Sequence, residues 1–264
     1  MAPRCPRGRN TGRLVGGIGP WRIVTSYIDH VTKTLVITGG TGGLGSALVG
    51  RLIKKDYRLA ITYLLPDEAQ SFESEFVVDE KKLLLSRVDC TNPEAVNSYI
   101  KEVADRWGGI HGLCSLVGGW AGGRDVEETD DVRFERMLDL NLRSAFYAVR
   151  AVIPYLKESG WGRIVLVGSR GAIDYFEAQA AFNIAKAGVA ALGQSVATEL
   201  DGSGVTANVL VPSVIDTPAT RRSLPYADYV NWPTPNEIAA VAEFLLSDES
   251  GVMNGALVPV YGRA

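Results

Sequence analysis

The amino-acid sequence predicts an α/β fold, a single domain in which a doubly wound, seven-stranded, mainly parallel sheet is flanked by helices. Three observations predict it. From residue 33 onward, short apolar runs rich in β-branched residues alternate with longer segments of helical periodicity. A glycine-rich turn directly follows the first of these runs. The chain of 264 residues, 46% hydrophobic, is also long enough to bury one large core.

The predicted strands are the short apolar runs, and helical segments separate most of them, which is typical of parallel pairing. They cover residues 34–37, 59–63, 83–88, 113–117, 163–167, 206–211 and 257–260.

The predicted helices lie between these strands, and two of them begin with capping signals. Asn92 is a candidate N-cap, and Pro93 suits the first helical position. Thr234 and Glu237 have the spacing of a capping box. Apolar residues at three- and four-residue intervals predict another long helix over residues 134–149.

The first 31 residues differ from the rest in composition. Arginines at positions 4, 7, 9 and 13 lie there among glycines and prolines, and the first acidic residue is Asp29. We expect residues 1–31 to form a disordered N-terminal extension and residues 32–264 to form the folded domain. A targeting peptide is the weaker alternative for the extension.

Charge and cysteine content restrict the class of partner. A net charge of -3 gives no electrostatic reason to expect nucleic acid or an anionic membrane surface. No apolar run approaches the roughly 20 residues that span a bilayer. Cys5, Cys90 and Cys114 are too few and too scattered for a disulfide framework or a zinc site. We therefore expect a cytoplasmic protein that acts on a small molecule and has no structural metal.

The glycine-rich turn predicts a nucleotide site at the end of the first strand. Glycine allows positive φ and close approach of a phosphate, and the N-terminus of the following helix offers free N–H groups. A glycine turn that serves only packing is the alternative. A P-loop is excluded because Ser46 and Ala47 stand where Lys and Ser/Thr are required. The turn comprises Thr38, Gly39, Gly40, Thr41, Gly42, Gly43, Leu44 and Gly45.

The spacing of Gly39, Gly43 and Gly45 resembles the Thr-Gly-x-x-x-Gly-x-Gly loop of the short-chain dehydrogenase/reductase family, classical type. The resemblance covers about residues 33–262. It implies a Rossmann-type fold and NAD or NADP as the cofactor. The cofactor-binding positions that it implies are Gly39, Thr41, Gly42, Gly43, Leu44, Gly45, Tyr63, Leu64, Asp89, Cys90, Val117, Gly118, Lys186, Pro212, Ile215 and Thr217. For Asp89, the start of a turn is an equally good interpretation.

The same resemblance implies a catalytic group with one member changed. Asn141, Ser169 and Lys186 match the family's asparagine, serine and lysine, but Phe182 occupies the position of the catalytic tyrosine. Phenylalanine cannot exchange a proton with a substrate oxygen. Tyr175 is a possible substitute, although we favour its interpretation as an aromatic residue lining the substrate pocket.

Other positions also depart from the family pattern. Gln179 stands where the enoyl-reductase variant has its tyrosine, so that arrangement is excluded. The usual Asn-Asn-Ala-Gly after the fourth strand is Ser-Leu-Val-Gly at residues 115–118, and the usual Pro-Gly is Pro212-Ser213. The second strand ends at Tyr63-Leu64 without an acidic or basic residue, which leaves NAD and NADP open.

We therefore expect an NAD(P)-dependent oxidoreductase that transfers a hydride between nicotinamide and a small carbonyl/alcohol or conjugated carbonyl substrate, with atypical proton delivery. The alternative is a nucleotide-binding regulatory or scaffold protein that has lost catalysis, and Phe182 is the residue that suggests it. The resemblance also implies a homodimer or homotetramer that pairs through the helices containing Asn141 and Lys186.

Overall fold

The computed structural model describes residues 32–76, 79–227 and 229–263. The predicted N-terminal extension, residues 1–31, therefore lies outside the described residues, as do residues 77–78, 228 and 264. None of the helices in the described part of the chain is both long and apolar enough to cross a bilayer.

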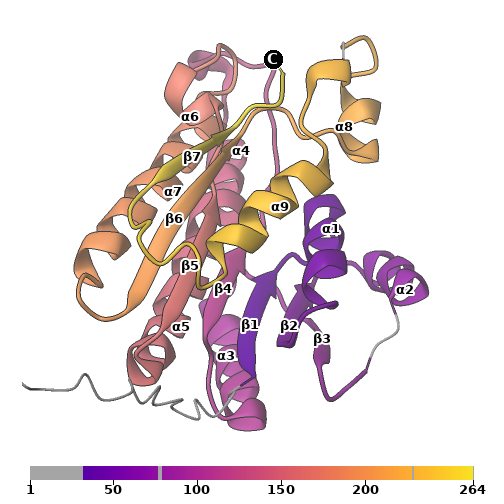
Figure 1. The fold of residues 1–264 in the computed structure, drawn as a ribbon. Coiled ribbons are helices and arrows are strands. Elements are labelled where there is room, and N and C mark those ends of the chain that lie inside the picture. Colours follow the sequence, from indigo (N-terminus) through magenta and orange to yellow (C-terminus); the bar gives the residue numbers. More distant parts are fainter. Residues whose placement is uncertain (1–31, 77–78, 228, 264) are drawn as a thin grey trace, which may run out of the picture. The chain divides into compact units, whose positions relative to one another are not determined.

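The predicted sheet is confirmed, and each of its strand pairs is parallel. Figure 1 shows its seven strands in the order β3-β2-β1-β4-β5-β6-β7. The order reverses between β1 and β4, and in sheets of this kind ligands bind at the carboxyl ends of the strands beside such a reversal. The strands are β1 (Lys33–Thr38), β2 (Tyr57–Tyr63), β3 (Leu83–Arg87), β4 (Gly112–Ser115), β5 (Gly162–Val167), β6 (Val205–Pro212) and β7 (Leu257–Val260).

Helices cover both faces of the sheet, as a doubly wound fold requires. Side chains alternate along each strand, so Leu35 and Ile37 pack on one face while Val36 packs on the other. The first face is covered by α1 (Gly43–Leu52), α2 (Pro66–Glu75) and α9 (Pro235–Leu245). The second is covered by α3 (Pro93–Trp107), α5 (Ser144–Ser159) and α7 (Ala180–Glu199).

Shorter elements connect these layers. They are the helices α4 (Asp131–Leu138), α6 (Gly171–Asp174) and α8 (Pro218–Ser223), the 3-10 turns η1 (Val126–Glu128) and η3 (Tyr229–Asn231), and the π-helical turn η2 (Asp139–Arg143).

The predicted helix starts are confirmed. The Asn92 side chain accepts a hydrogen bond from the Ala95 N–H at 3.0 Å, and Pro93 begins α3. Thr234 and Glu237 form the reciprocal capping box that precedes α9. Both signals depend on residues three apart in the chain, which is why they could be read locally.

The long helix predicted over residues 134–149 is interrupted. It consists of α4, the wider turn η2 and α5. The Asn141 side chain lies inside this turn and donates a hydrogen bond to the Met137 carbonyl, four residues back, at 3.1 Å. An amide that competes for a backbone carbonyl locally widens a helix, and such turns frequently mark functional sites.

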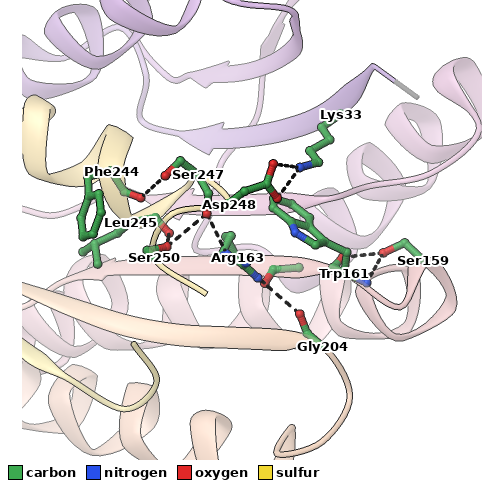
Figure 2. A network of polar contacts seen from close by, with 11 residues as sticks. Lys33, Ser159, Trp161, Arg163, Gly204, Phe244, Leu245, Ser247, Asp248 and Ser250 are labelled. Carbon is green, nitrogen blue, oxygen red and sulfur yellow. Dashed lines mark hydrogen bonds and ion pairs between the residues drawn. The ribbon is translucent and has the colours of Figure 1, made fainter. Parts of the chain in front are cut away.

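A polar network joins the amino-terminal ends of β1 and β5 (Figure 2). Lys33 at the start of β1 pairs with Asp248 at 2.7 Å, and its ammonium lies 3.8 Å from the centre of the Trp161 ring. The Arg163 guanidinium lies 4.4 Å from the same ring, and its side chain is only 5% exposed. It donates hydrogen bonds to the carbonyls of Ser247, Gly162 and Gly204 at 3.0, 2.8 and 3.3 Å. The network thus joins β1, β5 and the segment after α9 far from the carboxyl ends of the strands.

Candidate active site

The glycine turn after β1 is folded so tightly that only glycine fits at two of its positions. Gly39 has a φ of +67°, and a Cβ there would lie 3.1 Å from the Val117 backbone nitrogen. A Cβ at Gly45 would lie 2.5 Å from backbone atoms of Gly40. Thr62 in β2 holds the turn by accepting a hydrogen bond from the Gly39 N–H at 3.0 Å. The turn therefore has a defined shape before any ligand binds.

The mouth of this turn suits a diphosphate. Helix α1 begins after Gly42 with no side chain capping its N-terminus, so its first N–H groups are open to an anion. Thr217, which follows β6, lies against the turn, since a Cβ at Gly43 would be 3.1 Å from its Cγ2. The start of α8 thus lies against the turn, and the uncapped N–H groups of α1 fit the diphosphate of a dinucleotide.

The residues predicted beside the adenosine half lie at the ends of β2 and β3. Tyr63 is half-buried and Leu64 is exposed. Asp89 is exposed, and its carboxylate accepts hydrogen bonds from the Thr91 N–H and hydroxyl at 2.9 and 2.7 Å. These bonds match the turn-forming interpretation of Asp89 and leave its other oxygen available.

Cys90 contacts the threonine that holds the glycine turn in place. Its sulfur lies 3.6 Å from the Thr62 hydroxyl, the group that also holds Gly39. Burial raises the pKa of the Cys90 thiol to about 11, so the thiol stays neutral at pH 7. Cys90 and Cys114 are both free and buried.

Glu68 is a residue of this site that the sequence reasoning missed. It lies in the first turn of α2, and its carboxylate accepts a hydrogen bond from the Thr41 hydroxyl at 3.3 Å. An acidic residue about 20 positions beyond a glycine turn was the signal that could have found it.

Lys186 and Asn141 converge on the backbone that follows β4. A Cβ at Gly118 would lie 2.9 Å from the Asn141 side-chain oxygen and 3.2 Å from the Lys186 ammonium. Asn141 is 1% exposed and bonds the Gly119 N–H and carbonyl at 3.2 and 2.9 Å. The π-helical turn thus directs the Asn141 amide toward the loop after β4, and its two hydrogen bonds hold that loop beside Lys186.

The Lys186 ammonium is buried and has one acceptor in the part of the chain that the structure describes. Its side chain is 6% exposed and donates to the Val167 carbonyl at 2.8 Å. An ammonium has three donors, so two remain for a ligand. Burial lowers the pKa of Lys186 to about 8. The structure also places the ammonium 6.0 Å from the centre of the Phe182 ring, on the same face of α7.

Ser169 lies two residues beyond β5 and is half-buried. Its hydroxyl oxygen accepts a hydrogen bond from the Gly171 N–H at 3.1 Å, which leaves its proton free to donate. Its neighbour Arg170 donates a backbone hydrogen bond to the Pro212 carbonyl at 2.8 Å. That bond ties the loop after β5 to the end of β6, from which Ile215 and Thr217 follow.

Tyr175 lies apart from this group. It is 67% exposed, has a φ of +51°, and lines a cavity of about 400 Å³ together with Phe176, Asn183 and Ile184. Neither Ser169, Phe182 nor Lys186 lines that cavity. Of the changed residues at 115–118, Ser115 is the last residue of β4 and accepts a hydrogen bond from the Thr38 hydroxyl at 3.3 Å, so a polar brace persists between β1 and β4.

Comparisons with known proteins show which family this chain resembles. The short chain dehydrogenase family model matches residues 33–226. The chain is 32% identical over 200 residues to D-beta-hydroxybutyrate dehydrogenase of Rhizobium meliloti (strain 1021), covering 74% of this chain and 76% of that protein. It is 30% identical over 229 residues to 2-dehydro-3-deoxy-L-rhamnonate dehydrogenase (NAD(+)) of Sphingomonas sp. (strain SKA58), covering 83% and 90%.

A solved structure shows the same architecture. The crystal structure of levodione reductase superimposes with a TM-score of 0.80 at 26% identity, covering 87% of this chain and 96% of that one. The family model covers most of the chain, and the relatives extend over nearly all of the described domain. This chain belongs to the short-chain dehydrogenase/reductase family.

Proposed function

We propose that this protein is an NAD(P)-dependent oxidoreductase that transfers a hydride between nicotinamide and a small carbonyl/alcohol or conjugated carbonyl substrate, without a tyrosine hydroxyl at residue 182. The observation that carries the proposal is Lys186, whose buried ammonium has one hydrogen-bond acceptor among the described residues. A buried charge is costly unless it is paired or hydrogen-bonded. A ligand with hydroxyl groups at this point would satisfy its two remaining donors.

Separate residues would bind the diphosphate and the nicotinamide half of the cofactor. The turn at residues 38–45 and the N-terminus of α1 would hold the diphosphate of NAD or NADP. Lys186 would hold the nicotinamide ribose, and Ile215 and Thr217 would line the ring's side of the site. When bound, the nicotinamide supplies or accepts the hydride.

Substrate orientation would depend on Ser169. Its free hydroxyl proton can donate to a carbonyl oxygen, and this bond strengthens as negative charge develops there. Phe182 supplies no proton, so water or a side chain other than residue 182 would deliver it. A positioned general acid typically contributes about 10²–10⁴-fold, so hydride transfer without one is slowed and not abolished.

The names of the relatives support a hydroxy or keto substrate. One is named as a dehydrogenase of D-beta-hydroxybutyrate, and another as an NAD(+) dehydrogenase of 2-dehydro-3-deoxy-L-rhamnonate. The segment 219–229 leads from β6 toward α9, and exposed aromatic residues such as Tyr226 lie within it. We infer that this segment shapes the substrate pocket.

Turnover is the direct test of the proposal. Purified protein is mixed with NADH or NADPH and a panel of ketones, keto acids and enones, and oxidation is followed at the cofactor's absorbance. We expect turnover that falls at least about 100-fold in Lys186→Ala, because both ribose binding and charge near the reacting atoms are lost. Turnover equal in the two proteins would contradict the role of Lys186.

The charge of Lys186 also predicts a pH dependence of cofactor binding. Because burial lowers the pKa of Lys186 to about 8, the ammonium is protonated below that pH and neutral above it. We expect dinucleotide affinity to weaken as the pH rises through about 8, well below the ordinary lysine value of about 10.4. Calorimetric titrations from about pH 6.5 to 9.5 measure this, and Lys186→Met should lack the inflection. A wild-type affinity that stays constant over this range would count against the assignment.

The alternative is a nucleotide-binding regulatory or scaffold protein whose catalysis has lapsed. Phe182 favours it, since that residue removes the proton donor while Lys186, Asn141 and the glycine turn are kept. Tight dinucleotide binding without turnover on any substrate of the panel would support this alternative over the first proposal.

We also propose that the protein is a homodimer or homotetramer that pairs through α5 and α7. Phe146 in α5 and Ile184 in α7 are 43% and 51% exposed, and apolar side chains on these helices would be buried by a second copy. Sedimentation equilibrium measures the mass of the assembly, and a mass equal to one chain would contradict this pairing.

A further inference from the structure

The choice between NAD and NADP depends on the charge near the adenosine ribose. The two dinucleotides differ only by the 2′-phosphate, which is a dianion in NADP. A carboxylate accepts hydrogen bonds from unphosphorylated ribose hydroxyls and repels that phosphate, whereas Arg or Lys attracts it. The end of β2, where such a residue usually stands, is Tyr63-Leu64 and carries no charge.

A carboxylate does reach the glycine turn, but from helix α2 and not from the end of β2. Glu68 lies in its first turn and reaches the Thr41 hydroxyl at 3.3 Å, although the two residues are 27 positions apart. The turn is also tied to β2 through the hydrogen bond from the Gly39 N–H to Thr62. Thr41 and Glu68 therefore lie on the β2 side of the turn, whereas Ser169 follows β5 and Lys186 lies in α7, on the proposed nicotinamide side.

We infer that Glu68 is the residue that selects NAD over NADP in this protein. The inference rests on the proposed function, because it assumes that a dinucleotide lies over the glycine turn. The carboxylate has a second oxygen beyond the one that Thr41 contacts, and that oxygen is available to a ribose hydroxyl. A 2′-phosphate at the same place would meet the negative charge of Glu68 directly.

The neighbouring charges add to this effect more than they oppose it. Asp67 and Asp89 are exposed on the same edge, the first in α2 and the second after β3. Residues 38–45, 62–75 and 83–92 contain one basic residue, Arg87, whose Nε donates to the Leu64 carbonyl at 3.1 Å. The carboxylates thus outnumber the guanidinium, and a dianion gains less from Arg87 than it loses to the others.

The test is the affinity ratio for the two oxidised dinucleotides, measured calorimetrically on the full chain. We expect wild type to bind NAD+ at least about tenfold more tightly than NADP+. Glu68→Gln should reduce this ratio by about tenfold, because NADP+ affinity rises while NAD+ loses a charged acceptor. Raising the salt concentration should also reduce the wild-type ratio, since exposed charges are screened.

Controls separate selection from a structural role. Glu73→Gln makes the same change at an exposed position of α2 and should leave the ratio unchanged. If Glu68 only held Thr41 in place, Glu68→Gln would weaken both dinucleotides equally, and the inference would be wrong. Equal or tighter NADP+ binding by wild type would also overturn it while leaving the proposed function intact. Binding of neither dinucleotide would overturn the proposed function itself.

Discussion

Replacing Phe182 with tyrosine is expected to raise the rate of carbonyl reduction by about 10²–10⁴-fold, the usual contribution of a positioned general acid. The ring at residue 182 lies 6.0 Å from the Lys186 ammonium on the same face of α7. A hydroxyl added to that ring would therefore lie near a positive charge, which lowers the pKa of a phenol and favours proton exchange. Single-turnover reduction of a ketone from the panel measures the gain.

The matched control makes the same chemical change far from the site. Phe244→Tyr, at a 43% exposed position in α9, should leave the rate unchanged. If Phe182→Tyr bound the dinucleotide as wild type does and still reduced carbonyls at the original rate, the ring would not point at the reacting oxygen. If Phe182→Tyr gained the expected rate, the absence of one hydroxyl would account for the lack of catalysis that the alternative assumes.

Replacing Arg163 with alanine should destabilise the domain by about 3–4 kcal/mol. Arg163 is 5% exposed, and its guanidinium donates to three backbone carbonyls and packs on Trp161, so its removal leaves buried acceptors without partners. Burial lowers the pKa of Arg163, but its ordinary value is so high that it stays charged at every pH of interest. Urea unfolding followed by circular dichroism measures the change in the free energy of unfolding.

An exposed arginine provides the comparison for this change. Arg222→Ala in α8 should alter the free energy of unfolding by no more than about 0.5 kcal/mol. Arg163→Lys should fall between the two, because one ammonium cannot reach three carbonyls that a planar guanidinium spans. An Arg163→Ala protein as stable as wild type would show that the network in Figure 2 adds nothing to stability.

Much of the fold could be predicted because its signals are local. The alternation of strands and helices, the Asn92 cap and the Thr234–Glu237 capping box each depend on residues within a few positions of one another. The helix predicted over residues 134–149 is interrupted at Asn141, whose amide bonds the Met137 carbonyl and also Gly119 in the loop after β4, 22 positions earlier in the chain. Periodicity alone contains no information about such a partner.

The sequence by itself determined the strands, the helix starts and the tight turn after β1, since backbone propensity, side-chain period and glycine geometry act between chain neighbours. Only the tertiary structure decided that Lys186 is buried against Val167, that Asn141 clamps Gly119, and that Glu68 reaches Thr41. Each of these contacts joins segments that the strand order brings to one edge of the sheet. The free energy of a buried charge or amide depends on the groups around it, and the packing of the whole domain decides which groups those are.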